Sequence, residues 1–206
     1  MLGLDGCKKF MLSTVGVLAL TLVSSIVFIQ KDTKQTPRPI SISVEPYVPS
    51  WKCPDCTPEE QYVLEQLQEK TKINDKNALA TILGNIKQES NFRANVCEGG
   101  ARVSYDRCYR GGYGIIQWTS TGRYNGLGIF AKKYGCDPSE LKCQTRYMIN
   151  EDIFQRNLPD FEGGGQTVPH YMIPAYYWLG WGIKGKRETY AYDCLLYTSP
   201  SPRDRG

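Results

Sequence analysis

The stretch "ILGNIKQESNF", residues 82–92, places an ionisable side chain at the end of an apolar helical stripe. The preceding apolar residues recur at the three-to-four spacing of an amphipathic helix that begins near Asp75. They are Ala78, Leu79, Ile82, Leu83 and Ile86. Glu89 follows Ile86 by three positions and Ile82 by seven, so it shares their face. Glu89 therefore either caps or frays the helix end, or is held among apolar neighbours for a chemical purpose.

An apolar environment changes what a carboxyl group can do. The ordinary pKa of glutamate is about 4.3, and burial near an aromatic ring such as that of Phe92 raises it by disfavouring the anion. A carboxyl group that stays protonated near neutral pH can donate its proton to a leaving oxygen. Most helix glutamates are solvated and do no chemistry, so this pattern by itself does not assign a role to Glu89.

The sequence around this helix predicts further helices. Thr57, Pro58 and Glu60 form the signature of a capping box, which predicts a helix over roughly residues 58–70. Helical character returns over residues 121–134, although three glycines dilute it.

Three more segments of the chain favour helix. The stretch that begins at Asp137 predicts one longer helix through about Leu158, which "EGGGQT" then ends. Residues 168–182 predict a short aromatic helix, and residues 184–193 begin a last one.

The intervening stretch, residues 95–114, is a glycine-containing loop, and "GYGIIQW" (residues 112–118) fits a short strand or a turn. Little alternating strand pattern is present. The expected fold is therefore mainly α, with helices joined by glycine-rich loops.

Three motifs in this order resemble the lysozyme-like superfamily, and specifically the phage tail lysozyme domains. They are "ILGNIKQESNF", then "GGYGIIQWT", then "GR". The residues that carry the resemblance are Gly84, Asn85, Glu89, Ser90, Phe92, Gly112, Tyr113, Gly114, Gln117, Trp118, Gly122 and Arg123. "CQTRYMINEDI" resembles the later helix of that family, with Gln144, Tyr147 and Glu151 at matching places. The resemblance covers roughly residues 58–193, and goose-type lysozymes and lytic transglycosylases are similar more distantly.

The resemblance implies cleavage of the β-1,4 bond between N-acetylmuramic acid and N-acetylglucosamine in peptidoglycan. It implies that Glu89 is the general acid, and that Ser90 steadies the carboxyl or the substrate's N-acetyl group. Gln117 would hydrogen-bond the sugar or the catalytic centre, while Tyr113 and Trp118 would form walls of the cleft. Each residue also has a structural alternative, because Ser90 can cap backbone carbonyls and the two aromatic residues can be core.

A second carboxylate has no motif behind it. Glycosidases of the common type place it about 5–9.5 Å from the acid, and the candidates are Glu98, Asp106 and Glu151. Glu151 also fits packing or pairing within its helix. Without a second carboxylate, the substrate's own N-acetyl group could assist and leave an anhydro sugar. The choice between hydrolase and lytic transglycosylase therefore stays open.

Other chemistries have weak support in the sequence. His170 is the single histidine, nothing frames it as a base, and "VPHYMIP" indicates aromatic packing. No phosphate-binding or dinucleotide-binding glycine motif is present, and we expect neither a cofactor nor a metal. The net charge of +4 is too diffuse to indicate a nucleic-acid partner, although it fits a polyanionic bacterial envelope.

The cysteines suggest disulfides rather than metal ligands. Cys97 and Cys108 are neighbours in sequence, as are Cys136 and Cys143, and we expect these two pairs to bond. Cys53 and Cys56 either pair with each other or bond elsewhere. A zinc site at "CPDC" is the weaker alternative, since no second CxxC follows.

The N-terminal segment predicts attachment to a membrane. Residues 10–29 form a mainly apolar run that no charged side chain interrupts, and a bilayer span needs roughly 20 such residues. Lys8 and Lys9 favour a cytoplasmic end at residues 1–9. A proline-rich stalk follows at residues 30–52, and then the lysozyme-like domain at residues 53–193, outside the cytoplasm. A cleaved signal peptide is the alternative.

The last stretch, "CLLYTSPSPRDRG" (residues 194–206), does not continue the preceding pattern. It resembles the translation of a transposase sequencing adapter, so we expect the native sequence to break off near Asp193 and to hide any further domain. A disordered Ser/Pro tail is the alternative.

The sequence thus predicts a membrane-anchored enzyme that opens peptidoglycan, for a phage or for a secretion or conjugation apparatus. The rival hypothesis is a non-catalytic, disulfide-stapled module that binds glycan or serves in assembly.

Overall fold

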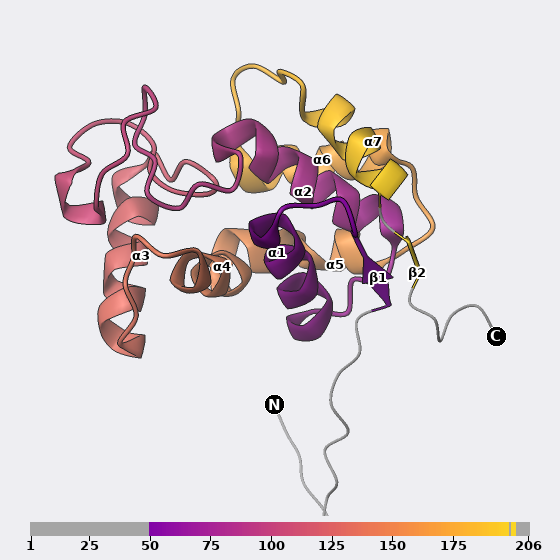
Figure 1. The fold of residues 1–206 in the computed structure, drawn as a ribbon, viewed down its shortest axis with the longest axis horizontal. Coiled ribbons are helices and arrows are strands. Elements are labelled where there is room, and N and C mark those ends of the chain that lie inside the picture. Colours follow the sequence, from indigo (N-terminus) through magenta and orange to yellow (C-terminus); the bar gives the residue numbers. More distant parts are fainter. Residues whose placement is uncertain (1–49, 198, 201–206) are drawn as a thin grey trace, which may run out of the picture. The chain divides into compact units, whose positions relative to one another are not determined.

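A computed structural model describes residues 50–197 and 199–200 (Figure 1). This part of the chain holds seven α-helices, one 3-10 helix and a single pair of two-residue strands. The prediction of a mainly helical domain with little strand is confirmed. The predicted membrane anchor, with the residues before it and nearly all of the stalk, lies outside the described residues. Among the helices that are described, none combines the length and the hydrophobicity that a bilayer span requires.

The helix α1 (Pro58–Lys70) begins at the predicted capping box. The Thr57 hydroxyl accepts a hydrogen bond from Glu60 N (3.3 Å), and the Glu60 carboxylate accepts one from Thr57 N (2.9 Å). These bonds satisfy two backbone donors that the first turn leaves free. Val63 and Leu67 on the inner side of α1 are fully buried.

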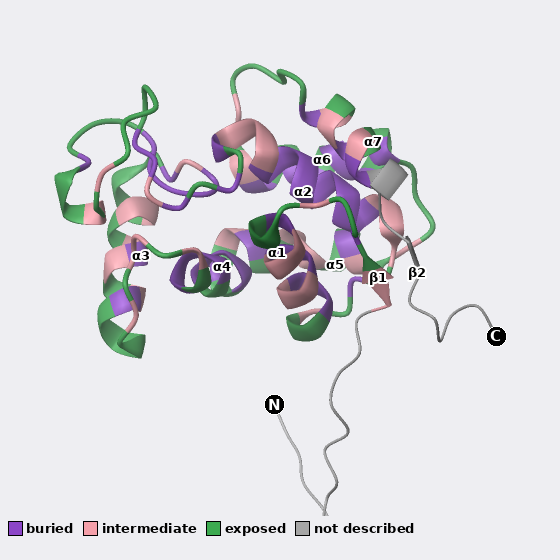
Figure 2. Ribbon diagram, viewed as in Figure 1, coloured by how far each residue is buried: buried purple, intermediate pink, exposed green. Residues whose placement is uncertain are grey.

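The helix α2 (Lys76–Ser90) lies at the centre of the domain and is mostly buried (Figure 2). Asp75 caps its start by accepting from Asn77 N and Ala78 N. The helices α6 (Val168–Leu179) and α7 (Arg187–Tyr197) pack against it.

A glycine, Gly84, allows the backbone of α7 to approach α2 closely. A Cβ added to Gly84 would lie 2.8 Å from the Cα of Ala191 on α7, well inside ordinary contact. The Gly84 position in the first motif therefore has a packing reason, since a larger residue would push the two helices apart.

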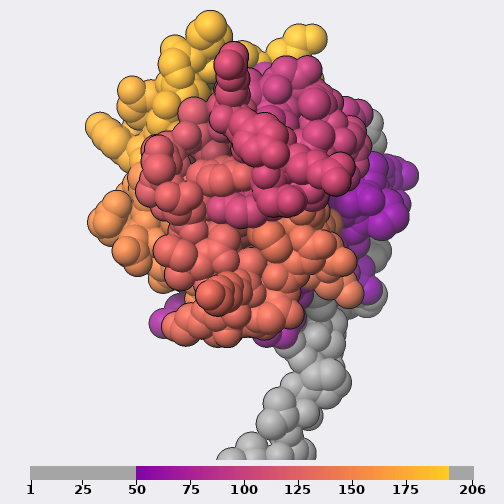
Figure 3. All heavy atoms as spheres, turned by 90° about the vertical axis from the view of Figure 1, so that its left-hand side faces the viewer, coloured from indigo at the N-terminus to yellow at the C-terminus, as the bar shows by residue number. Residues whose placement is uncertain are grey.

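The predicted loop after α2 and the helix α3 (Thr121–Tyr134) form one end of the domain, the face seen in Figure 3. The chain leaves α2 through Asn91 and Phe92, which both have positive φ (52° and 60°). The loop contains the short 3-10 helix η1 (Tyr105–Arg107). "GYGIIQW" forms a tight turn in which Tyr113 and Trp118 exchange two backbone hydrogen bonds (3.3 and 2.9 Å).

One prediction about the helices is wrong. The segment from Asp137 onward does not form one long helix but two, α4 (Leu141–Asn150) and α5 (Asp152–Glu162). The chain breaks at Glu151, which has extended backbone angles (φ −70°, ψ 133°). The sequence pattern missed this break because Glu151 is held by a tertiary ion pair to Arg123 on α3, and not by any neighbour in its own helix.

Three disulfides staple the described residues. The bonds Cys97–Cys108 and Cys136–Cys143 are present as expected, and Cys53 bonds to Cys56. The zinc alternative for "CPDC" is therefore wrong, because both of its thiols are used in a disulfide.

The last described residues fall within the stretch that resembles an adapter. The helix α7 continues past Asp193 to Tyr197, and Cys194 is a buried free thiol. The strand β2 (Ser199–Pro200) pairs antiparallel with β1 (Trp51–Lys52). The origin of residues 194–206 stays a prediction.

Candidate functional site

Glu89 lies in the last turn of α2, where the helix meets the loop that follows it. Its side chain keeps only 17% of its surface exposed, and its Oε1 accepts a 2.6 Å hydrogen bond from Nη2 of Arg187. Burial raises the pKa of Glu89 above its ordinary value, while Arg187 and then Arg123 act in the opposite direction. Because burial outweighs both cations, the protonated form persists to a higher pH than in an exposed glutamate.

Arg187 is a site residue that the sequence did not reveal. It is the first residue of α7 and is 5% exposed. Its guanidinium lies over the ring of Trp181 (4.6 Å to the centroid) and donates to the carbonyl of Asn85 (3.4 Å) as well as to Glu89. No motif marks it, and only its place at the start of the last predicted helix could have drawn attention to it.

The segment between α6 and α7 is fastened to the same end of α2. Lys186 N donates to the Gln88 side chain (2.8 Å), and a Cβ at Gly185 would lie 2.9 Å from that amide carbon. Gly185 has a positive φ of 58°, which glycine adopts without steric cost. This attachment holds the start of α7, with Arg187, beside Glu89.

Ser90 and Gln117 are bonded to backbone in this structure. The buried Ser90 hydroxyl donates to the carbonyl of Ile115 (2.8 Å), which ties the end of α2 to the 112–118 turn. The half-buried Gln117, at φ 52°, donates through Nε2 to the carbonyls of Gly114 (2.9 Å) and Val96 (3.3 Å). Ser90 thus fits its structural alternative, the capping of backbone carbonyls.

Tyr113 and Trp118 are fully buried, which corrects the expectation that they form walls of a cleft. Their turn folds inward, so the Tyr113 hydroxyl donates to the carbonyl of Val103 (3.2 Å) and the Trp118 ring packs on Tyr147 (5.3 Å between centroids). Both rings belong to the core, the alternative that the sequence left open.

Gln144 organises the same turn from α4. It is fully buried, its Oε1 accepts from Ile115 N (2.9 Å), and its Nε2 donates to the carbonyls of Ala94 (2.8 Å) and Pro138 (2.7 Å). Gly114 has a positive φ of 75°, and an added Cβ there would lie 2.6 Å from the Gln144 amide nitrogen. The glycine and the glutamine of the two motifs are therefore a matched packing pair.

Glu151 is engaged on both of its oxygens. Arg123 donates Nε to Oε1 (2.6 Å) and Nη2 to Oε2 (2.7 Å), and the Trp118 indole donates to Oε2 (3.4 Å). The Glu151 side chain is 7% exposed. A pocket of about 580 Å³ lies beside this pair, bordered also by Gly122 and Tyr147.

The other two candidates for a second carboxylate are exposed and bonded locally. Glu98 accepts from Gly112 N (3.1 Å). Asp106 accepts from the Ser104 hydroxyl (2.6 Å), which lowers the pKa of Asp106. Within the described residues, no hydrogen bond or ion pair joins Glu98, Asp106 or Glu151 to Glu89.

His170 is exposed on α6, and its ring lies edge-on to the ring of its buried neighbour Tyr171 (6.2 Å between centroids), in line with the expected aromatic packing. Among the residues that the structure describes, no three His, Cys, Asp or Glu side chains gather into a group that could hold a metal ion.

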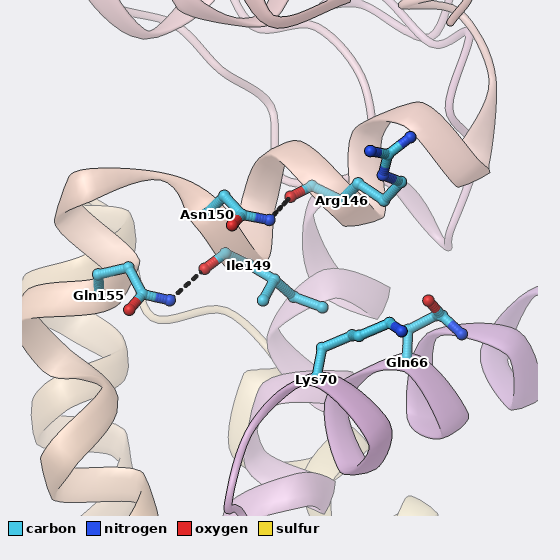
Figure 4. A pocket seen from close by; sticks show the side chains of 6 residues that line it. All are labelled: Gln66, Lys70, Arg146, Ile149, Asn150 and Gln155. Atoms are coloured by element: carbon cyan, nitrogen blue, oxygen red, sulfur yellow. Dashed lines mark hydrogen bonds between the residues drawn. The ribbon is translucent and has the colours of Figure 1, made fainter. Parts of the chain in front are cut away.

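A larger pocket of about 730 Å³ lies between α1 and α4 and contains no predicted site residue (Figure 4). Its lining is Gln66, Lys70, Arg146, Ile149, Asn150 and Gln155. The charge of Lys70 is offset by Glu69 (2.6 Å), and the amides of Asn150 and Gln155 donate to backbone carbonyls. The guanidinium of Arg146 lies over the rings of Phe130 and Tyr134 (5.8 and 5.2 Å to the centroids) and makes no hydrogen bond or ion pair within the described residues.

Residues 59–160 match the family model of phage tail lysozyme. The match confirms the resemblance carried by the motifs and assigns this segment to that family. It includes Glu89, the 112–118 turn, Arg123 and Glu151, whereas Trp181 and Arg187 lie beyond it. No curated protein and no solved structure matches the chain.

Proposed function

We propose that this protein cleaves the glycan strands of peptidoglycan at the β-1,4 bond between N-acetylmuramic acid and N-acetylglucosamine, with Glu89 as the general acid. The family match supports a lysozyme-like activity on peptidoglycan. The observation that carries the assignment to Glu89 is its environment. A carboxyl group in the last turn of a buried helix keeps part of its surface exposed while burial raises its pKa.

The chemistry asked of Glu89 is proton donation. Its carboxyl proton passes to the glycosidic oxygen as the bond from that oxygen to the anomeric carbon breaks, so the leaving sugar departs as a neutral alcohol. A positioned general acid contributes typically about 10²- to 10⁴-fold to such a step. The developing positive charge on the sugar then needs a nucleophile from water or from the substrate itself.

The surroundings of Glu89 support a mechanism with a single essential carboxyl group. Both oxygens of Glu151 are occupied by Arg123 and Trp118. Glu98 and Asp106 are exposed and bonded to their own loops. This arrangement favours assistance by the substrate's N-acetyl group and an anhydro product, as in lytic transglycosylases, over hydrolysis with a second carboxylate.

We place this activity outside the cytoplasm, on a membrane-anchored stalk. The three disulfides support an oxidising compartment, and the apolar run at residues 10–29 supports the anchor. A tethered enzyme suits local opening of the wall by a phage or by a secretion or conjugation apparatus. If the N-terminus of the protein from a membrane preparation began after about Ile29, the anchor would be replaced by a cleaved signal.

The deciding experiment is mass spectrometry of the fragments that the purified full chain releases from peptidoglycan. Anhydro-muramic ends identify a lytic transglycosylase, and reducing muramic ends identify a hydrolase. The matched control is Glu89→Gln, which keeps the side-chain shape but cannot donate the carboxyl proton. Release of no fragments by a folded wild-type protein would overturn the proposal and favour the non-catalytic glycan-binding module.

A further inference from the structure

The ion pair between Glu89 and Arg187 is asymmetric. Arg187 Nη2 donates to Oε1 alone, at 2.6 Å. Oε2 of Glu89 accepts no hydrogen bond within the described residues, and it is not among the buried polar atoms that lack a partner. Oε2 therefore reaches solvent, while Oε1 is held from inside the domain.

Arg187 itself is fixed on several sides. Its side chain is 6% exposed, its guanidinium lies over the Trp181 ring, and it also donates to the carbonyl of Asn85. Its Nε is buried without a partner. A guanidinium held in this way gives Oε1 a donor of fixed direction, which a freely rotating lysine would not.

The two oxygens of Glu89 are therefore chemically different. A proton on Oε1 would compete with the Arg187 donor, so the proton of the neutral carboxyl belongs on Oε2. We propose that Arg187 is a positioning residue of this site, which grips Oε1 and thereby directs the transferable proton to Oε2, the oxygen open to the glycan. This inference rests on the proposed function of Glu89 as general acid.

The same contact has a measurable consequence for pH dependence. The charged groups that act on Glu89 are Arg187 on α7 and Arg123 on α3, and Arg187 has the larger effect. Both cations favour the anion of Glu89, which is inactive as an acid. Arg187 therefore lowers the fraction of Glu89 that is protonated, but it fixes the position of the carboxyl group. Removing the Arg187 side chain should extend activity to higher pH and lower the maximal rate.

The test is the pH profile of kcat/KM on soluble peptidoglycan fragments for Arg187→Gln and Arg187→Lys. In Arg187→Gln the alkaline limb should move up by roughly 1 pH unit, because the closest opposite charge is gone. The maximal rate should fall by about 10- to 100-fold, because the carboxyl group is no longer held in place. In Arg187→Lys the limb should stay near its wild-type position while the rate still falls, since an ammonium keeps the charge without the planar fork.

The matched control is Lys184→Gln, which removes one positive charge from the same segment. Lys184 is exposed and pairs with Glu188 rather than with Glu89. Both its rate and its profile should equal those of the wild type.

Four outcomes distinguish the role of Arg187 from the proposed function of Glu89. Glu89-dependent cleavage with an unshifted profile in Arg187→Gln overturns the role of Arg187, as does an Arg187→Lys variant with full rate. A wild-type protein that does not cleave, or a Glu89→Gln variant as active as wild type, overturns the proposed function instead. If Arg187→Gln does not fold, Arg187→Lys decides the positioning role, and an NMR titration of the Glu89 carboxyl carbon in that variant reports the ion pair directly.

Discussion

Two buried carboxylates in this domain face an arginine, and they are held in opposite ways. Glu151, at the break between α4 and α5, is gripped on both oxygens by Arg123 and touched by the Trp118 indole. Glu89, at the end of α2, is gripped on one oxygen by Arg187 and keeps more of its side chain exposed, 17% against 7%.

Under the proposed function, this difference separates a structural carboxylate from the general acid. A carboxylate whose two oxygens both accept hydrogen bonds is fixed at both oxygens and presents neither of them without a partner to a substrate. A carboxylate held on one side only is fixed in place and can still exchange a proton on the other. Both residues are glutamates within matching family motifs, so only their partners tell them apart.

The largest expected effect is on activity. Glu89→Gln should lower the rate of glycan cleavage by about 10²- to 10⁴-fold, because it removes the proton donor. Glu151→Gln, assayed at a temperature where it is folded, should stay within about tenfold of wild type, because local structure changes but the proton donor does not. Equal losses in the two variants, measured on the same substrate, would contradict the contrast between the two glutamates.

The two substitutions should rank in the opposite order when stability is measured, with Glu151→Gln the more destabilising. Glu151→Gln should lose about 3 kcal/mol in the free energy of unfolding, because Arg123 is left partly buried without its anion. Urea unfolding followed by circular dichroism would measure this loss.

The control for that measurement is Glu188→Gln, which breaks the more exposed pair with Lys184. It should cost less than about 1 kcal/mol. A similar loss in the two variants would mean that the Glu151 pair is not the structural one.

A smaller effect should follow from a substitution that displaces the Glu89–Arg187 ion pair and leaves the Arg123–Glu151 pair in place. Gly84→Ala inserts a Cβ against the backbone of Ala191, so it should cost about 1–3 kcal/mol and separate α7 from α2. Because Arg187 opens α7, the alkaline limb of activity should move in the same direction as in Arg187→Gln. The Arg123–Glu151 pair, which involves neither helix, should keep its geometry.

The control for this substitution is Gly122→Ala in α3, where an added Cβ meets no atom within 4 Å. It should be neutral or stabilising, by at most about 1 kcal/mol, since alanine favours helix. If Gly84→Ala were equally neutral, the close approach of α7 would not depend on the glycine.

The smallest expected effect is on how the free energy of unfolding varies with pH, through the ionisation of Glu89. Its pKa in the folded protein is raised, so the stability that this group contributes is fully present below its unfolded pKa of about 4.3. That contribution is lost as the pH rises through the folded pKa. Glu89→Gln does not ionise, so its stability relative to wild type should increase between pH 4 and 7. A decrease over that range would show that Arg187 outweighs burial.

Much of the fold follows from local sequence signals. Several helix boundaries are each set by residues within one turn of them, so they could be predicted. They are the capping box at Thr57, the start of α2 at Asp75 and the ends of α3. The disulfide pairs were accessible because each joins cysteines close in the chain.

The break at Glu151 was not predictable in this way, because the residue that holds it is 28 positions away. The burial of Tyr113 and Trp118 escaped prediction too. An aromatic residue in a glycine-rich turn fits a cleft wall and a core equally well until the direction of the turn is known.

The sequence by itself determined most of the helices, although not the break at Glu151, together with the apolar face that carries Glu89 and the family motifs, because these depend on spacing along one segment. Tertiary structure alone decided which glutamate is free to exchange a proton. The difference between the two glutamates depends on Arg187, which is 98 residues from Glu89 in the sequence. The close packing of α2 and α7 at Gly84 places its guanidinium against Oε1 of Glu89. Spacing within one helix can predict which side of that helix is buried, but not which charge from another helix will face it.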